Sequence, residues 1–275
     1  MRDDDARDHP DLTRLDLALD QKWSLVTCSH GWPFHRLPQR LAEALEVPDR
    51  LVTLHEALWR EVYLAADILD DLQDGDLEAE PAKILAPLVS VRGLARCMAL
   101  AGQAPDPVPV LSILSRTLNE LVEAQAWDLR PRDATGRQLV ASLEGRTGAT
   151  MAGMLETLAH FSPLSVPCPG ALARWGRAIG AALQWRSDLD AAAEAGPSSP
   201  RWHMFVRTLG GLGLSPPASP GLVMATVRLH LARLSGDIMD SMTGTEPSGV
   251  SEALNEALGI ALDLRLAGRR MGLHA

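Results

Sequence analysis

Ala65-Ala66-Asp67-Ile68-Leu69-Asp70-Asp71-Leu72-Gln73-Asp74 is the stretch that decides the fold, because it ends a long apolar segment with closely spaced carboxylates. At 3.6 residues per turn, Asp70 and Asp74 stack one turn apart, and Asp67 and Asp71 flank them. Like charges this close repel one another, so a folded helix needs water or a cation to compensate them. The stretch therefore predicts a divalent-metal site at the end of a helix.

The composition is that of an ordinary globular protein. The 275-residue chain is 46% hydrophobic and 22% charged, which is enough for a buried core. Its net charge of −9 argues against a nucleic-acid partner, because phosphate backbones recruit clusters of Lys and Arg. The three widely spaced cysteines, Cys28, Cys97 and Cys168, form no metal-ligand pattern, so we expect reduced thiols in a cytoplasmic protein. We also expect no signal peptide and no membrane span.

Residues typical of helices dominate, and the alternating Val, Ile and Thr runs typical of strands are nearly missing. We therefore predict an all-α fold, with a flexible N-terminal segment over residues 1–22 and a single domain over residues 23–275. Pro and Gly residues mark where helices stop or start. The predicted helices cover residues 38–45, 51–74, 81–101, 108–127, 135–160, 170–195, 202–212, 220–243 and 250–271.

Two faces of the predicted 51–74 helix differ in character. One face is a continuous apolar stripe suited to packing, formed by Leu51, Leu54, Leu58, Val62, Ala65, Leu69 and Leu72. The second face carries Trp59, Tyr63 and Ala66 before Asp70 and Asp74, so it is apolar first and acidic at its C-terminal end. This order predicts a central helix that lines a cavity, with metal-binding groups at the mouth. The alternative is a solvated acidic helix end, where the carboxylates meet the unfavourable end of the helix dipole.

An acidic mouth over an apolar pocket suits one class of ligand. Carboxylates are hard oxygen ligands for Mg²⁺, which is commonly bound through one or two carboxylates together with substrate phosphates. A diphosphate joined to a hydrocarbon therefore fits this pattern.

Four segments resemble, in order, the motifs of the polyprenyl synthetase family of class I isoprenoid synthases. Asp70-Asp71-Leu72-Gln73-Asp74 resembles the first aspartate-rich motif, Asp-Asp-x-x-Asp. Gln125-Ala126-Trp127-Asp128-Leu129 is similar to Gly-Gln-x-x-Asp-Leu, with Ala124 in place of the Gly. Glu144-Gly145-Arg146-Thr147-Gly148 resembles Gly-Lys-Thr-Gly, with Arg146 at the Lys position. Gln184-Trp185-Arg186-Ser187-Asp188-Leu189-Asp190 resembles the second aspartate-rich motif, Gln-x-x-Asp-Asp-x-x-Asp.

The resemblance implies an all-α isoprenoid synthase bundle around a central cavity, and usually a homodimer. It implies that Mg²⁺, usually three ions and with Mn²⁺ as a possible substitute, bridges carboxylates and the diphosphate of a prenyl diphosphate substrate. The metal ligands would be Asp70, Asp71, Asp74 and Asp188, with Asp70, Asp74 and Arg146 catalytic. The substrate-binding residues implied by the motifs and the cavity face are Arg146, Thr147, Gln184, Trp59, Tyr63, Ala66 and Gln125.

The second motif departs from the family pattern. Ser187 stands where the family has its first Asp, and Ala191 where it has its last. Asp188 shares a helix face with Gln184, whereas Asp190 falls to the other side, so Asp188 is the expected ligand. A helix with one carboxylate is also simply amphipathic, and that alternative stays open.

The basic residues with which chain-elongating relatives bind a second diphosphate are also largely missing. The family's Arg-Arg-Gly after the first motif is replaced by the acidic stretch Leu77-Glu78-Ala79-Glu80-Pro81. An anionic cosubstrate needs cations, so the sequence favours a terpene synthase that ionises and rearranges one prenyl diphosphate. Ala65 and Ala66 leave room for a twenty-carbon chain or a bicyclic diphosphate. The alternatives are a prenyltransferase that elongates chains or uses another acceptor, and a non-catalytic partner subunit of a prenyl synthase.

Overall fold

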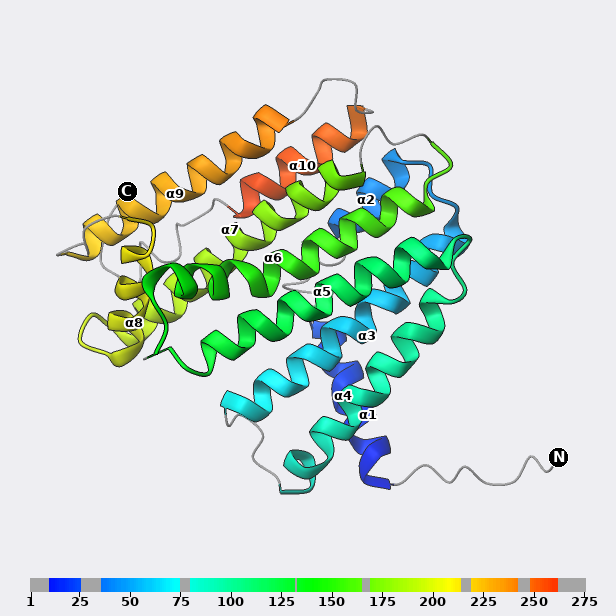
Figure 1. The fold of residues 1–275 in the computed structure, drawn as a ribbon, viewed down its shortest axis with the longest axis horizontal. Coiled ribbons are helices and arrows are strands. Elements are labelled where there is room, and N and C mark those ends of the chain that lie inside the picture. The colour runs from blue at the N-terminus through cyan, green and yellow to red at the C-terminus, as the bar shows by residue number, and fades with distance from the viewer. Residues whose placement is uncertain are drawn as a thin grey trace. The chain divides into compact units, whose positions relative to one another are not determined.

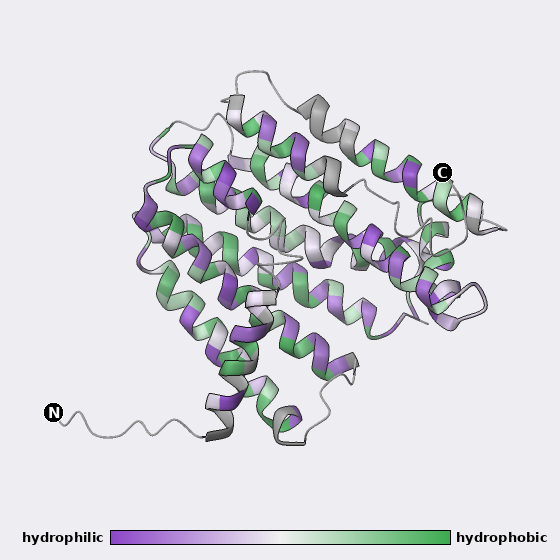
Figure 2. Cartoon of the chain, turned by 180° about the vertical axis from the view of Figure 1, so that it is seen from behind, coloured by the Kyte–Doolittle hydropathy of each residue, from purple (hydrophilic) through white to green (hydrophobic). Residues whose placement is uncertain are grey.

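A computed structural model describes residues 10–25, 36–74, 80–131, 133–164, 169–213, 219–241 and 248–261. Within these ranges the chain forms ten α-helices and no strand, which confirms the predicted all-α fold. Hydrophobic and hydrophilic residues alternate along the helices, as expected when each helix buries only part of its surface (Figure 2).

The helices belong to two compact units, which are described separately. The first unit contains α1 (Pro10–Leu25), α3 (Asp49–Asp74) and α4 (Glu80–Ala101). The second contains α2 (Leu37–Ala44), α5 (Pro107–Asp128), α6 (Gly136–Phe161), α7 (Pro169–Ala195), α8 (Pro200–Gly210), α9 (Pro220–Ser241) and α10 (Ser248–Ala261) (Figure 1). The prediction of a single domain over residues 23–275 stays a prediction.

All nine predicted helices are present, with starts that differ by at most two residues from those expected. One further helix, α1, was not predicted, and the boundary expected at residue 23 falls inside it. Its sequence is polar, but Leu19 packs against the cluster formed by Ile68, Ala86 and Val89. Tertiary packing therefore accounts for order that a local reading of the sequence does not reveal.

The first unit is built on the packing of α3 against α4. Of the predicted apolar stripe, Leu51, Leu58, Val62 and Ala65 are buried as expected. Its other members, Leu54, Leu69 and Leu72, are half-buried, whereas Ile68, which was not assigned to the stripe, is 1% exposed. The hydroxyl of Ser90 donates a 2.9 Å hydrogen bond to the carbonyl of Ala65, which ties the two helices together. The carboxylates of α3 follow these packed turns at the C-terminal end of the helix.

The second unit is built on the crossing of α6 and α7, which run side by side (Figure 1). Gly176 and Gly180 let the backbones meet, because a Cβ at Gly176 would lie 2.3 Å from the Met151 carbonyl oxygen. A Cβ at Gly180 would lie 2.5 Å from the carbonyl oxygen of Thr147. No side chain larger than hydrogen fits at either position without moving one backbone away from the other.

The remaining helices of the second unit surround this pair. Thr135 begins α6 with a capping box, in which its hydroxyl and the side chain of Gln138 satisfy free backbone N–H groups. Trp185 on α7 lies in a core cluster with Trp202, Phe205 and residues of α9. Arg40 of α2 forms ion pairs with Glu252 and Glu256 of α10.

One helix in the described ranges, α4 over Lys83–Ala101, is long and apolar enough to cross a membrane by length and composition. The criterion is weak evidence, because core helices of soluble proteins meet it too. Ala86, Val89 and Cys97 of this helix are buried, whereas Ile84, Leu88, Val91 and Met98 are exposed. The expectation that the chain has no membrane span stays a prediction.

Gly180→Ala tests the helix crossing. The added methyl group meets backbone atoms of Thr147 and Gly148, which cannot rotate away, so we expect a loss of about 2 kcal/mol in the free energy of unfolding. Urea denaturation measures it. Gly236→Ala on α9 is the control, because a Cβ there meets nothing within 4 Å and should leave stability unchanged or raise it by about 0.5–1 kcal/mol. Equal stability of both variants would contradict the close crossing.

The Cys97 thiol provides a second test. Burial, and secondarily the charge of Glu61, raises its pKa to about 12. At pH 8 only about one thiol in ten thousand is then ionised, against about a quarter of ordinary thiols. In a Cys28→Ser/Cys168→Ser background we expect no labelling by a thiol reagent at pH 8 over hours, and full labelling in urea. Rapid labelling of the folded protein would show that Cys97 is not buried as described.

Candidate functional site

The carboxylates of α3 occupy the last two turns of that helix. Asp67, Asp70 and Asp71 are half-buried, while the side chain of Asp74 lies outside the described part of the structure. Among the described side chains, no group of three or more His, Cys, Asp or Glu residues is arranged to hold a metal ion. The three carboxylates nevertheless offer hard oxygen donors at neighbouring positions on one helix.

The electrostatics of this helix end favour a cation. The last turn of α3 contains no basic residue, although the C-terminal end of a helix carries partial negative charge. Each carboxylate therefore adds to the negative potential of the helix end. The donor set is of the kind that Mg²⁺ takes, so the residues present fit this ion by their chemistry.

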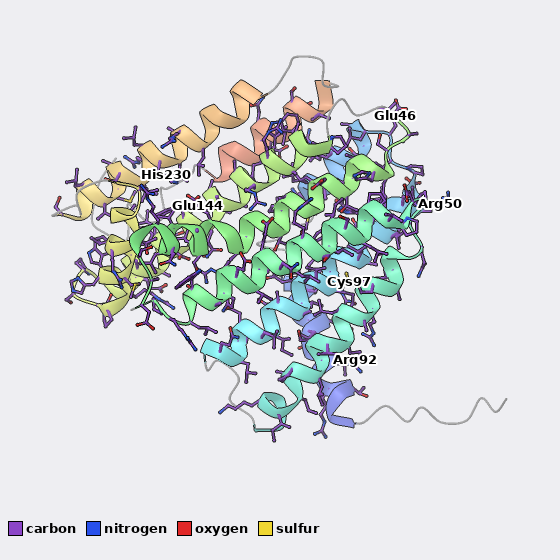
Figure 3. All side chains as sticks on the ribbon, in the orientation of Figure 1. Glu46, Arg50, Arg92, Cys97, Glu144 and His230 are labelled. Atoms are coloured by element: carbon purple, nitrogen blue, oxygen red, sulfur yellow. The ribbon has the colours of Figure 1, made fainter. Side chains whose placement is uncertain are left out.

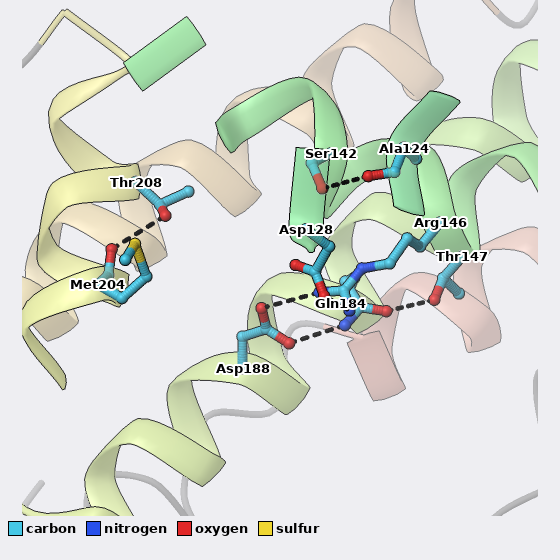
Figure 4. A network of polar contacts seen from close by, with 9 residues as sticks. All are labelled: Ala124, Asp128, Ser142, Arg146, Thr147, Gln184, Asp188, Met204 and Thr208. Carbon is cyan, nitrogen blue, oxygen red and sulfur yellow. Dashed lines mark hydrogen bonds and ion pairs between the residues drawn. The ribbon is translucent and has the colours of Figure 1, made fainter. Parts of the chain in front are cut away.

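A second polar group joins α5, α6 and α7 through Arg146 (Figure 4). Its guanidinium donates to Asp128 Oδ2 at 3.1 Å and to Asp188 Oδ2 at 3.4 Å. Gln184 donates to the other oxygen of Asp188 at 2.7 Å, and Thr147 donates to the side-chain oxygen of Gln184. One arginine thus holds two carboxylates from two other helices, and we call these five residues the Arg146 network.

Asp188 is a half-buried member of the Arg146 network. Burial raises the pKa of its carboxyl, and the positive charge of Arg146 together with the Gln184 hydrogen bond partly opposes that rise. Both of its oxygens already accept a hydrogen bond from the protein. Asp188 therefore has an ion-pairing role in this structure, and its predicted role as a metal ligand stays a prediction.

Four of the residues predicted to bind substrate, three on α3 and one on α5, differ in their surroundings. Trp59 is 1% exposed, and its ring N–H has no hydrogen-bond partner among the described residues. The ring of Tyr63 packs against Trp23 of α1, with centroids 5.7 Å apart. Ala66 is exposed, and Gln125 is half-buried on α5. The roles of these four residues in substrate binding stay predictions.

Sequence reasoning brought Arg146, Thr147, Gln184 and Asp188 to one site, and these four side chains do contact one another. It did not assign a role to Asp128, although the residue stands in the quoted segment that precedes α6. Its position in that segment was the only signal.

A further polar group was not predicted. Glu144 Oε1 accepts a 2.9 Å hydrogen bond from the Trp185 ring and lies 2.8 Å from His230 Nε2. Glu144 lies on α6 and His230 on α9, and both are labelled in Figure 3. Helical periodicity could not predict this contact, because it relates residues only a few positions apart, whereas Glu144 and His230 are 86 positions apart.

Several solved structures have a fold similar to that of this chain. No family model and no curated protein sequence matches the chain. Among solved structures, a geranyltranstransferase from Methanosarcina mazei aligns over 90% of each chain, with a TM-score of 0.64 and 16% identity. An Arabidopsis medium/long-chain prenyl pyrophosphate synthase covers 94% of this chain and 97% of its own, with a TM-score of 0.56 and 15% identity. A polyprenyl synthetase from Streptomyces coelicolor A3(2) covers 85% and 74%, with a TM-score of 0.54 and 18% identity.

The chain has the all-α fold of the isoprenoid synthases. The expectation drawn from four short motifs is therefore confirmed at the level of the fold. At 15–18% identity the likeness does not carry over a reaction, because one fold supports many activities.

Arg146→Met tests the Arg146 network. Removing the guanidinium leaves Asp128 and Asp188 without their shared cation, so we expect a loss of about 1–2 kcal/mol in the free energy of unfolding. Asp188→Asn in the Arg146→Met background should recover part of that loss, because the amide carries no charge.

The control is Arg177→Met. Arg177 pairs with Glu120 but its side chain is 47% exposed, so its loss should cost less than about 0.5 kcal/mol. Chemical denaturation is measured for five proteins: the unaltered protein, Arg146→Met, Asp188→Asn, the double variant and Arg177→Met. A simple sum of the effects of Arg146→Met and Asp188→Asn would mean that these residues do not interact.

Proposed function

We propose that this protein is a metal-dependent prenyltransferase, which ionises an allylic prenyl diphosphate and joins the prenyl group to an acceptor. The observation that carries the proposal is the acidic end of α3, without a basic residue in its last turn, on the isoprenoid synthase fold. The aligned structures are described as a geranyltranstransferase and prenyl synthases, which supports transfer over other reactions.

Asp70, Asp71 and Asp74 would hold Mg²⁺, or Mn²⁺ in its place, when the diphosphate binds. The ion supplies Lewis acidity toward the leaving diphosphate oxygens. Carboxylates that repel one another in the free protein would be neutralised on binding, so binding of the ion and of the diphosphate would reinforce each other.

We assign Arg146 to the binding of the substrate diphosphate. Its forked guanidinium matches the geometry of phosphate oxygens and stays charged at any physiological pH. In the free protein Asp128 and Asp188 hold this fork at fixed positions. The two carboxylates thus keep the Arg146 guanidinium oriented before substrate arrives. A bound diphosphate would then replace one of them as a hydrogen-bond acceptor.

A terpene synthase is the second candidate. The acidic sequence Leu77-Glu78-Ala79-Glu80-Pro81 replaces the basic residues that elongating relatives use for an anionic cosubstrate. This departure favours either a single-substrate reaction or an acceptor without a diphosphate. The small side chain of Ala66, which is exposed on α3, is compatible with a long or bicyclic substrate in either case, whereas Ala65 is buried against α4.

One assay distinguishes these candidates. The purified protein is incubated with Mg²⁺ and geranyl, farnesyl, geranylgeranyl or copalyl diphosphate, with and without isopentenyl diphosphate. Longer prenyl diphosphates would support the transferase, and hydrocarbons or alcohols from one diphosphate would identify a terpene synthase. Diphosphate release that requires an added aromatic or peptide acceptor would indicate transfer to that acceptor. No turnover of any substrate by the protein alone, with or without an acceptor, would overturn the proposal. A change in the activity of an added prenyl synthase would then indicate a non-catalytic subunit.

Asp70→Asn tests the metal-binding role within this proposal. The amide keeps the size of the side chain but loses its charge, so we expect kcat/KM for diphosphate release to fall at least about 100-fold, or about 3 kcal/mol. Raising the Mg²⁺ concentration should restore part of the activity. Asp133→Asn, on an exposed loop, should retain full activity. Unchanged turnover of Asp70→Asn would remove this residue from the reaction.

A further inference from the structure

Glu144 joins three helices of the second unit through one oxygen. The ring N–H of Trp185 on α7 donates a 2.9 Å hydrogen bond to Glu144 Oε1, and the same oxygen lies 2.8 Å from Nε2 of His230 on α9. The rings of Trp185 and His230 also meet edge to face, with centroids 5.2 Å apart. Each of these three side chains therefore contacts the other two, and we call them the Glu144 triangle.

The Glu144 triangle lies on the same turns of α6 and α7 as the Arg146 network. Glu144 precedes Arg146 by two residues, and Trp185 directly follows Gln184. At a rise of about 1.5 Å per residue, the two sets of hydrogen bonds are about 3 Å apart along α6 and about 1.5 Å apart along α7. Neighbouring residues leave a helix in different directions. Two links at one level in different directions restrict rotation of α7 about its own axis, which a single link does not.

The hydrogen bond to Glu144 determines how the Trp185 ring is oriented. Trp185 is 0% exposed and lies in the core cluster with Phe205 and Val227. Because a buried N–H without an acceptor is unfavourable, the ring is held where it reaches Glu144. Apolar contacts tolerate small rotations, whereas a hydrogen bond weakens steeply away from its preferred angle. The contact with Glu144 therefore fixes the orientation of the turn of α7 that carries Trp185.

This contact complements the close approach of the two helices at Gly180. Gly180 lies five residues before Trp185, which is about 7.5 Å along α7, and it brings the backbones together. A glycine has no side chain with which to make a directional contact. Glu144 supplies that contact farther along the same helix pair.

We propose that Glu144 is a positioning residue for the Arg146 network. By holding Trp185, it fixes the turn of α7 from which Asp188 reaches Arg146, and His230 in turn holds the carboxylate of Glu144. The guanidinium is thereby kept in the orientation in which it would meet a substrate diphosphate. This last step rests on the proposed function, whereas the effect of Glu144 on the Arg146 network does not.

A double-mutant cycle tests the first step without any substrate. The coupling free energy between Arg146→Met and Asp188→Asn is measured by urea denaturation in the unaltered protein and in the Glu144→Leu background. We expect the coupling to fall at least about twofold in Glu144→Leu, which accepts no hydrogen bond, and to be kept in Glu144→Gln, whose amide oxygen accepts one. Trp185→Phe removes the donor and keeps an aromatic ring in the core, so it should lower the coupling to the same extent. It supplies the same test if Glu144→Leu does not fold.

Glu156→Leu is the matched control. Glu156 also lies on α6 and also pairs with another helix, through Arg116 of α5. Its loss should leave the coupling between Arg146 and Asp188 unchanged even if it lowers the stability of the protein. A purely structural Glu144 would behave in the same way. Unchanged coupling in Glu144→Leu or in Trp185→Phe, with that variant folded, would therefore overturn the proposal.

The second step is tested with the prenyl diphosphate that the protein turns over in the assay above. Glu144→Leu should raise the KM for this substrate at least about tenfold, whereas Glu144→Gln should change it less than about twofold. Because Glu144 acts through Arg146, Glu144→Leu should raise KM no further in the Arg146→Met background. Multiplicative effects of the two substitutions on KM would overturn the positioning role. Absence of turnover with every substrate would refute the proposed function, and the double-mutant cycle would then decide the role of Glu144 by itself.

Discussion

The backbone contact between α6 and α7 is the constraint on which the second unit depends. Gly176, Gly180, Gln184 and Asp188 follow one another at intervals of four residues, so they form one column on α7. The two glycines at the start of the column bring the backbone of α7 against Met151 and Thr147. The polar residues of the same column are then carried to the side chains of Thr147 and Arg146. Close packing at one end of the column thus sets the geometry of the polar group at the other.

This geometry explains how Asp188 is tolerated in the segment that resembles the second aspartate-rich motif. The family motif that this segment resembles has three aspartates, whereas this chain has Asp188 and Asp190, with Ser187 and Ala191 at two of the motif's aspartate positions. Burial makes ionised Asp188 costly, and Arg146 with Gln184 offsets part of that cost. Asp188 thus has a cationic partner within the protein, which it shares with Asp128, whereas the last turn of α3 contains no basic residue.

The extent to which the sequence predicted the structure follows from the range of the interactions involved. Helical periodicity is local, so the nine predicted helices and the buried part of the α3 stripe could be derived from spacing alone. The motif resemblance placed Arg146 with Thr147 and Gln184, because the family's order of segments encodes a tertiary contact. The pairing of Asp128 with Arg146, the contact of Glu144 with His230 and the order of α1 depend on distant partners. No short-range pattern specifies these contacts.

The same reasoning explains why α3 carries two chemically different regions. Its middle turns must pack on α4, so they present Leu64 and Ala65, and the mixed charges of Arg60 and Glu61 lie at the edge of that packing. Its last turns carry carboxylates at positions where packing alone would favour none. A helix that only supported the core would not retain half-buried Asp70 and Asp71 at the end with the unfavourable dipole. The cost of keeping Asp70 and Asp71 there is the physical argument on which their proposed role in binding rests.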